Sequence, residues 1–207
     1  MSHTLHREGG VESLSKDFVV LAMPVQGHTE GSGAKLKRFL ELSQKYHPVN
    51  NGNSKVGNIY MEGGYKRLYE ETKDAGICHA VLTSPEDLAG FLNDLKAEDL
   101  GISIVVSGLM DVVGECCHKA GLHPHTVNMS LGIYGKTEKL VPDDEREITT
   151  MCGHGMVTGD LVVDMVKRIK AGRTTPEKAS EELAALCVCG IYNTARSADL
   201  LRRMAEK

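Results

Sequence analysis

The stretch FVVLAMP, residues 18–24, decides the fold that the sequence predicts. It is continuously apolar and rich in β-branched residues, which is typical of a strand buried on both faces, as in a parallel sheet. Two similar runs follow, CHAVLT at 78–83 and ISIVVSG at 102–108. Segments with the pattern of helices alternate with these runs. This alternation predicts right-handed crossovers and a three-layer α/β domain with a mostly parallel sheet.

The helices are predicted from apolar periodicity and from their start signals. Ser84 and Pro85 open one helix with a capping hydroxyl group and a proline at the first helical position. Further helices are expected at 34–46, 65–76, 109–122, 159–171, 176–186 and 194–204. The helices 159–171 and 176–186 should form a hairpin, because the joining segment is short, and the last helix completes the fold.

Two other segments carry weaker signals. Residues 125–135, HTVNMSLGIYG, are expected to supply one more strand. Residues 47–57, HPVNNGNSKVG, are rich in turn-forming residues and predict a mobile surface loop.

The chain of 207 residues is long enough for one domain with a sizeable core. We expect a flexible arm over residues 1–16, an α/β core over 17–147, and a helical cysteine-bearing subdomain over 148–207 that packs on the core. The net charge of -4 argues against a nucleic-acid or membrane surface, which would need a basic excess. The expected partner is a small-molecule substrate, and a homo-oligomer is left open.

The cellular location is predicted from what the chain lacks. No apolar run approaches the roughly 20 residues of a membrane span, and the start MSHTLHREGG has no apolar signal-peptide core. These features predict a cytoplasmic protein. In that compartment the six cysteines are more typical of thiols or metal ligands than of disulfides.

Three cysteines stand in unusual surroundings. Cys152 lies in TMCGHGMVTGD (150–160), and Cys187 and Cys189 lie in LCVCGIYN (186–193). Each segment places cysteine beside glycine next to a predicted helix end. Glycine allows close backbone approach, and a helix N-terminus favours a thiolate. The predicted hairpin would return the chain to its starting point, so the two segments should meet.

Three thiolates in one site suit two kinds of metal centre. They can bind an iron–sulfur cluster of the [4Fe–4S] type and leave one iron open for substrate. Alternatively they can bind zinc, with a histidine or water as the fourth ligand. His154 and His118 are candidates for that place. We therefore expect Cys152, Cys187 and Cys189 as metal ligands.

The leading hypothesis is an iron–sulfur enzyme that acts on a small anionic substrate in a lyase-type or sulfur-transfer reaction. Cys152 and His154 are its expected catalytic residues, because a histidine between two glycines is free to reach the sulfur site. Cys116 or Cys117 is an alternative fourth ligand, although helical core packing is their default role.

A local similarity suggests a different chemistry. MCGHG, residues 151–155, resembles the catalytic-cysteine segment of the proline racemase family, in which a thiol at a helix start exchanges the substrate α-proton. The resemblance implies a second cysteine facing the first, for which Cys189 before Gly190 is the candidate. The alternatives to the leading hypothesis are thus a metal-free two-thiol isomerase or racemase, and a non-enzymatic metal carrier, assembly protein or structural zinc domain.

Two further segments are candidate ligand contacts. A glycine-rich loop follows the first strand, and Gly31, Ser32 and Gly33 are expected to bind a ligand where open α/β sheets place theirs. A plain flexible turn is the alternative, since the loop has no Walker A pattern. In the strand expected at 125–135, His125 and Asn128 predict a substrate-facing surface, and an exposed edge strand is the alternative.

Overall fold

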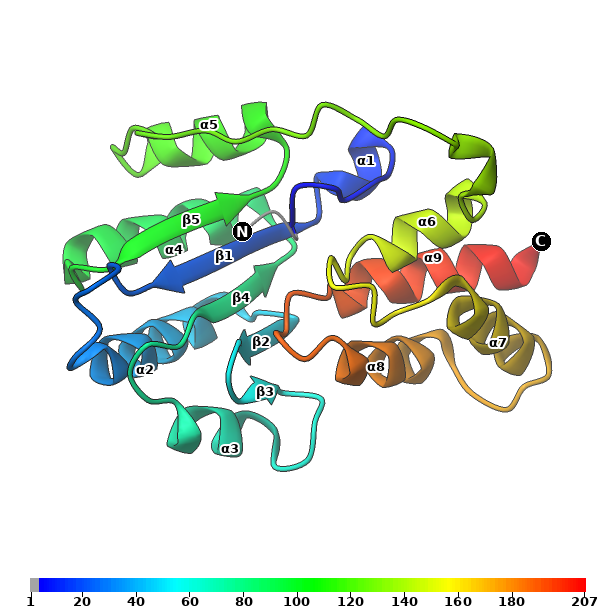
Figure 1. Cartoon of the computed structure of the whole chain (residues 1–207), viewed down its shortest axis with the longest axis horizontal. Coiled ribbons are helices and arrows are strands. Elements are labelled where there is room, and N and C mark those ends of the chain that lie inside the picture. Colours follow the sequence, from blue (N-terminus) through cyan, green and yellow to red (C-terminus); the bar gives the residue numbers. More distant parts are fainter. Residues whose placement is uncertain (1–3) are drawn as a thin grey trace.

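The computed structural model describes residues 4–207, in which helices cover both faces of a five-stranded sheet (Figure 1). The strands are β1 (Phe18–Met23), β2 (Asn50–Asn53), β3 (Gly57–Asn58), β4 (Cys78–Leu82) and β5 (Ser103–Ser107). The helices are α1 (Val11–Leu14), α2 (Ser32–Ser43), α3 (Gly64–Glu71), α4 (Pro85–Glu98), α5 (Met110–Lys119), α6 (Asp143–Thr149), α7 (Gly159–Lys170), α8 (Pro176–Leu186) and α9 (Thr194–Glu206).

The prediction of a mostly parallel sheet is wrong. The strand order is β3-β2-β4-β1-β5, and every neighbouring pair is antiparallel. The strands joined by a helix do run in the same direction: β1 and β2 through α2, β3 and β4 through α3, β4 and β5 through α4. One oppositely directed strand lies between the members of each pair, as in a split βαβ unit. The alternation of strand and helix therefore indicates that strands joined by a helix run in the same direction. It does not indicate which strands are neighbours in the sheet.

The long apolar run of β1 arises because both faces of this strand are covered. Val19 and Leu21 pack against the C-terminal helices, whereas Phe18 and Val20 pack against a separate core built with α2 and α4. Continuous burial is thus achieved in an antiparallel sheet by a helical layer from the last third of the chain. Val105 is half-buried, because β5 is an edge strand.

The helices were predicted more accurately than the sheet. Ser84 Oγ accepts a hydrogen bond from the Asp87 N–H at 3.0 Å and caps α4, as expected. The hairpin α7–α8 and the final helix α9 also lie where the sequence places them. In residues 4–207 no helix combines the length and the apolar character needed to cross a membrane.

The strand expected at 125–135 is absent, and this segment crosses the surface without regular structure. The expected arm falls partly outside the described residues, since residues 1–3 are not among them. The described part of the arm, from Thr4 onward, includes α1 and lies next to α6 (Figure 1).

The segment expected as a mobile surface loop at 47–57 instead contains a buried strand. This strand is β2, with the sequence NNGN. It is hydrogen-bonded to the backbone segment that follows α8. Asn50 Nδ2 donates to the Tyr192 carbonyl at 3.0 Å, and Asn58 Nδ2 on β3 donates to the Cys187 carbonyl at 2.8 Å. The C-terminal layer is therefore fixed to the sheet by amide hydrogen bonds.

At Gly52 the backbone of the sheet lies close to the backbone of the C-terminal layer. A Cβ atom at Gly52 would lie 2.6 Å from the Cα atom of Gly190 and still closer to the Cys189 carbonyl oxygen. Gly190 itself adopts a φ of 74°, in the left-handed region that favours glycine.

We expect Gly52→Ala to lower the free energy of unfolding by at least about 2 kcal/mol, because the added methyl group meets backbone atoms that cannot rotate away. Denaturant titration of the variant measures this loss. Gly114→Ala on α5 is the matched control, since its methyl group would meet nothing within 4 Å. A helix-interior alanine there should raise stability by about 0.5–1 kcal/mol. Equal stability of both variants would contradict the close approach.

Candidate functional site

The structure brings Cys152, Cys187 and Cys189 together in one buried cluster between the sheet and the C-terminal helices. Cys187 Sγ lies 4.0 Å from Cys189 Sγ, and Cys152 is near enough to Cys187 for each thiol to shift the pKa of the other. None of the three side chains is more than 6% exposed. The hairpin α7–α8 returns the chain to this point, which is the route that the sequence predicts.

His154 is the exposed member of the group. Its Nδ1 atom lies 3.7 Å from Cys189 Sγ, so the ring is within reach of the thiols while its other side faces solvent. The other proposed ligands are not at this site. Cys116 packs in the core on the opposite face of the sheet and donates to the Pro85 carbonyl at 3.3 Å, and His118 is exposed on the same helix, α5.

The helix ends near the cysteines differ from those expected. Cys152 follows the C-terminus of α6, and Cys187 is the C-terminal capping residue of α8, so both lie at the negative end of a helix dipole. In place of a helix N-terminus, individual backbone N–H groups favour the thiolate form of these cysteines. Those of Met156 and His154 act to lower the pKa of Cys152, and that of Ile191 acts to lower the pKa values of Cys187 and Cys189.

The thiols form a relay in which Cys152 bonds to Cys187 and Cys187 bonds to Cys189. The hydrogen bond from Cys187 lowers the pKa of Cys189. The hydrogen bond from Cys152 lowers the pKa of Cys187, but the bond to Cys189 and burial outweigh it and raise that pKa to about 12. The bond to Cys187 and burial raise the pKa of Cys152. Cys189 is therefore the first of the three to become a thiolate.

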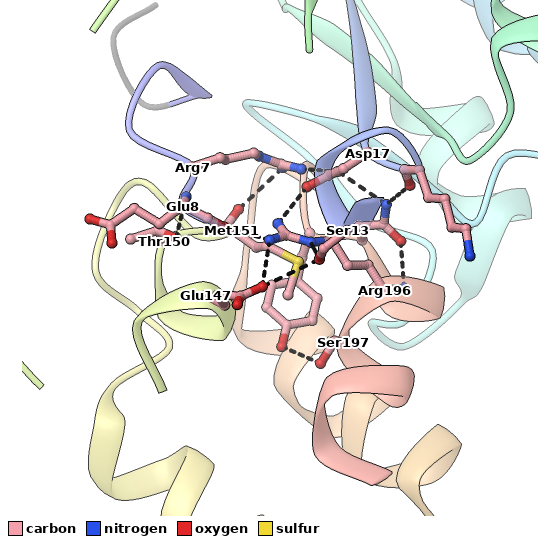
Figure 2. A network of polar contacts seen from close by, with 12 residues as sticks. Arg7, Glu8, Ser13, Asp17, Glu147, Thr150, Met151, Arg196 and Ser197 are labelled. Carbon is pink, nitrogen blue, oxygen red and sulfur yellow. Dashed lines mark hydrogen bonds and ion pairs between the residues drawn. The ribbon is translucent and has the colours of Figure 1, made fainter. Parts of the chain in front are cut away.

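A guanidinium group joins the two cysteine segments, and sequence reasoning missed it. Arg7 Nη2 donates to the carbonyl of Met151 at 3.3 Å and also to that of Ile191, while Nη1 pairs with Asp17 (Figure 2). Next to it, the Glu8 N–H donates to Thr150 Oγ1 at 3.1 Å. One side chain of the N-terminal segment thus contacts the residue before Cys152 and the second residue after Cys189.

Asp17 is the centre of the buried charges in Figure 2. Its carboxylate accepts from Arg7, from Arg196 Nη1 at 2.9 Å and from Asn193 Nδ2 at 3.0 Å. The Asp17 side chain is fully buried, and those of Arg7 and Arg196 are 6% and 2% exposed. No local pattern in the sequence reveals this group, because its members come from opposite ends of the chain.

The glycine-rich loop binds an anion of its own chain. Asp74 accepts hydrogen bonds from the N–H groups of Gly31 at 2.9 Å and Gly33 at 2.6 Å, and these bonds lower its pKa. Ser32 Oγ accepts from the Ala75 N–H at 3.0 Å. The carboxylate of Asp74 takes the place at this helix start that we expected a ligand to fill.

The pair His125 and Asn128 lies on the exposed surface segment and not on a strand face. His125 Nδ1 lies 2.9 Å from the neighbouring Thr126 Oγ1. The structure therefore does not bring these two side chains to the cysteine cluster.

Within residues 4–207 no group of three or more His, Cys, Asp or Glu side chains stands in the arrangement of a metal site. Comparison of the chain with protein-family models, with curated proteins and with solved structures found no match.

We expect Cys189 to react with iodoacetamide at lower pH than an ordinary thiol, because the reactive species is the thiolate and its pKa is lowered. Cys187→Ala removes the hydrogen-bond donor and should shift the rate profile of Cys189 to higher pH. Cys187→Ser retains a donor and is the control, with a profile close to the original. Peptide mass spectrometry of alkylated, metal-free protein measures both. Identical profiles for the two variants would contradict the relay.

Proposed function

We propose that the protein is an iron–sulfur enzyme whose cluster is bound by Cys152, Cys187 and Cys189. The single observation that carries the proposal is the convergence of these thiols from two distant segments in one buried cluster, where neighbouring backbone N–H groups act to lower their pKa values. Such N–H groups stabilise thiolate ligands and help to set the potential of a cluster. A cytoplasmic location is part of the proposal, because it keeps the thiols reduced.

Cluster binding would require the thiols to separate, since each cysteine of a four-iron cluster binds a different iron. The neighbouring backbone allows such a shift. Glycine flanks the cysteines at Gly153, Gly155 and Gly190, and the first two are exposed. Gly190 lies against the sheet, so the movement would fall mainly on the Cys152 segment.

Three cysteine ligands leave one iron without a protein sulfur, and this iron would act as a Lewis acid toward a small anionic substrate. His154 is the side chain placed to move a proton there, because its ring contacts Cys189 and reaches solvent. This arrangement supports a lyase-type or sulfur-transfer reaction as the proposed chemistry.

One measurement favours zinc as a second candidate. A tetrahedral zinc ion with Zn–S bonds of about 2.3 Å and a Zn–N bond of about 2.0 Å holds two sulfur ligands about 3.8 Å apart and a sulfur and a nitrogen ligand about 3.5 Å apart. The observed separations are 4.0 Å between Cys187 and Cys189 and 3.7 Å between Cys189 and His154. A mononuclear ion would therefore need less rearrangement than a cluster, in a structural or carrier role.

We expect protein purified without oxygen to be brown and to contain iron and acid-labile sulfide. Replacement of Cys152, Cys187 or Cys189 by alanine should abolish both, because each supplies one ligand. Cys78→Ala is the control and should keep full metal content, since Cys78 lies in the core on the opposite face of the sheet. Stoichiometric zinc without iron would support the second candidate, and colourless, metal-free protein would favour the two-thiol isomerase.

We expect His154→Ala to keep the wild-type melting temperature but to lose most of the turnover or to weaken metal retention. The reason is that an exposed loop substitution costs little stability, whereas the ring contacts a ligating sulfur. His28→Ala, an exposed histidine in the other glycine-rich loop, is the matched control. Wild-type metal content and turnover in His154→Ala would show that the histidine has no role at the site.

A further inference from the structure

We propose that Arg7 is the positioning residue of the cysteine site. Residues 5–9, here termed the strap, hold the Cys152 segment and the Cys187–Cys189 segment at a fixed separation. When the strap detaches, the two segments are free to move apart. The inference rests on the proposed function for its meaning, since it concerns loading and retention of whatever the thiols bind. Its physical basis is independent of metal.

The geometry of Arg7 is that of a bridge. Its guanidinium group donates to carbonyl oxygens of Met151 and Ile191, which belong to segments about 40 residues apart in the chain. A planar guanidinium with donors in fixed directions holds two acceptors at a set separation, which a single hydrogen bond cannot do. The Cys152 segment and the Cys187–Cys189 segment are therefore tied together one or two residues from the thiols.

The inner side of the strap is strongly anchored. Asp17 fixes the guanidinium of Arg7, and Arg196 binds both Asp17 and the Glu8 carbonyl. The Glu8 N–H reaches Thr150, next to Met151. With the strap in place, the two segments have little freedom and the thiols are shielded from solvent.

The outer side of the strap is open. Leu5, Arg7 and Glu8 line a hollow of about 520 Å³ whose other wall is formed by Ser130, Gly132 and Ile133. Among the described residues, Arg7 Nε and Glu8 Oε1 are buried without a hydrogen-bond partner. Desolvated polar groups of this kind lower the stability of the closed state. The strap is thus held by hydrogen bonds on its inner side and is not packed on its outer side. Such a segment can detach without disrupting the rest of the fold.

The test compares thiol reactivity in Arg7→Gln and wild-type protein, both metal-free and under native conditions. We expect alkylation of Cys152, Cys187 and Cys189 to become at least roughly tenfold faster, because loss of buried charge-assisted hydrogen bonds favours local opening. Cys78, in the other core of the same molecule, is the internal control and should keep its wild-type rate. Acceleration of all four cysteines together, or of none, would overturn the proposal.

Further variants keep the test decisive if Arg7→Gln folds poorly. Thr150→Val removes the tether to Glu8, together with the local hydrogen bond from Thr150 Oγ1 to the Arg146 carbonyl, and should accelerate the same three thiols by a smaller factor. Arg168→Gln, which breaks the Arg168–Glu182 pair on the helical hairpin without touching either cysteine segment, should leave all rates unchanged. In Arg7→Ala, guanidinium ion at a concentration far below that which unfolds proteins should restore protection. Absence of both the Thr150→Val effect and the rescue would overturn the role of Arg7.

Metal retention separates this inference from the proposed function. In protein that carries metal, Arg7→Gln should release it to a chelator at least roughly tenfold faster than wild type. Protein that shows the selective thiol acceleration but never binds metal supports the strap and contradicts the iron–sulfur and zinc proposals. Protein that binds metal but releases it at the wild-type rate in Arg7→Gln contradicts the strap.

Discussion

The buried carboxylate of Asp17 is the interaction on which the rest of the structure depends. It precedes β1 and receives charged or amide donors from Arg7, Arg196 and Asn193. An isolated carboxylate in such a place would be strongly destabilising, so its partners must arrive together. These partners belong to the N-terminal segment and to the start of α9. The carboxylate that precedes β1 therefore also positions the C-terminal helices. Through Arg7 the constraint extends to the backbone on either side of the thiol cluster.

The sequence predicted the secondary structure well where the signal is local. Capping at Ser84 and the apolar run of β1 depend on neighbours along the chain, and both elements form as expected. Strand pairing was predicted wrongly because continuous apolar character reports burial of both faces and not the direction of the neighbour. β2 was missed for a related reason. Its asparagine side chains donate to carbonyl groups of distant residues. In composition, a strand that is rich in such asparagines cannot be distinguished from a turn.

The candidate site shows the same division. The meeting of Cys152 with Cys187 and Cys189 followed from helix lengths and a short connection, which the sequence displays. The proximity of His154 to Cys189 followed from two glycines. Arg7 and Asn58 had no signal, since their acceptors are backbone carbonyls that every residue possesses. The expectation of a thiolate at a helix N-terminus was wrong because Cys152 lies close to the C-terminus of α6. The sequence did not reveal that a helix ends just before this loop.

The coverage of β1 has a consequence for synthesis. Its C-terminal-layer face, with Val19 and Leu21, is covered mainly by residues from the last third of the chain, and Asp17 meets Arg196 across 179 residues. Contacts of such high sequence separation form late and slowly. A nascent chain therefore carries an uncovered apolar sheet face, and a carboxylate that lacks its partners Asn193 and Arg196, until α9 leaves the ribosome. Such a face is prone to aggregation during that interval. The three thiols acquire their common environment only once the Cys187–Cys189 segment has also left the ribosome.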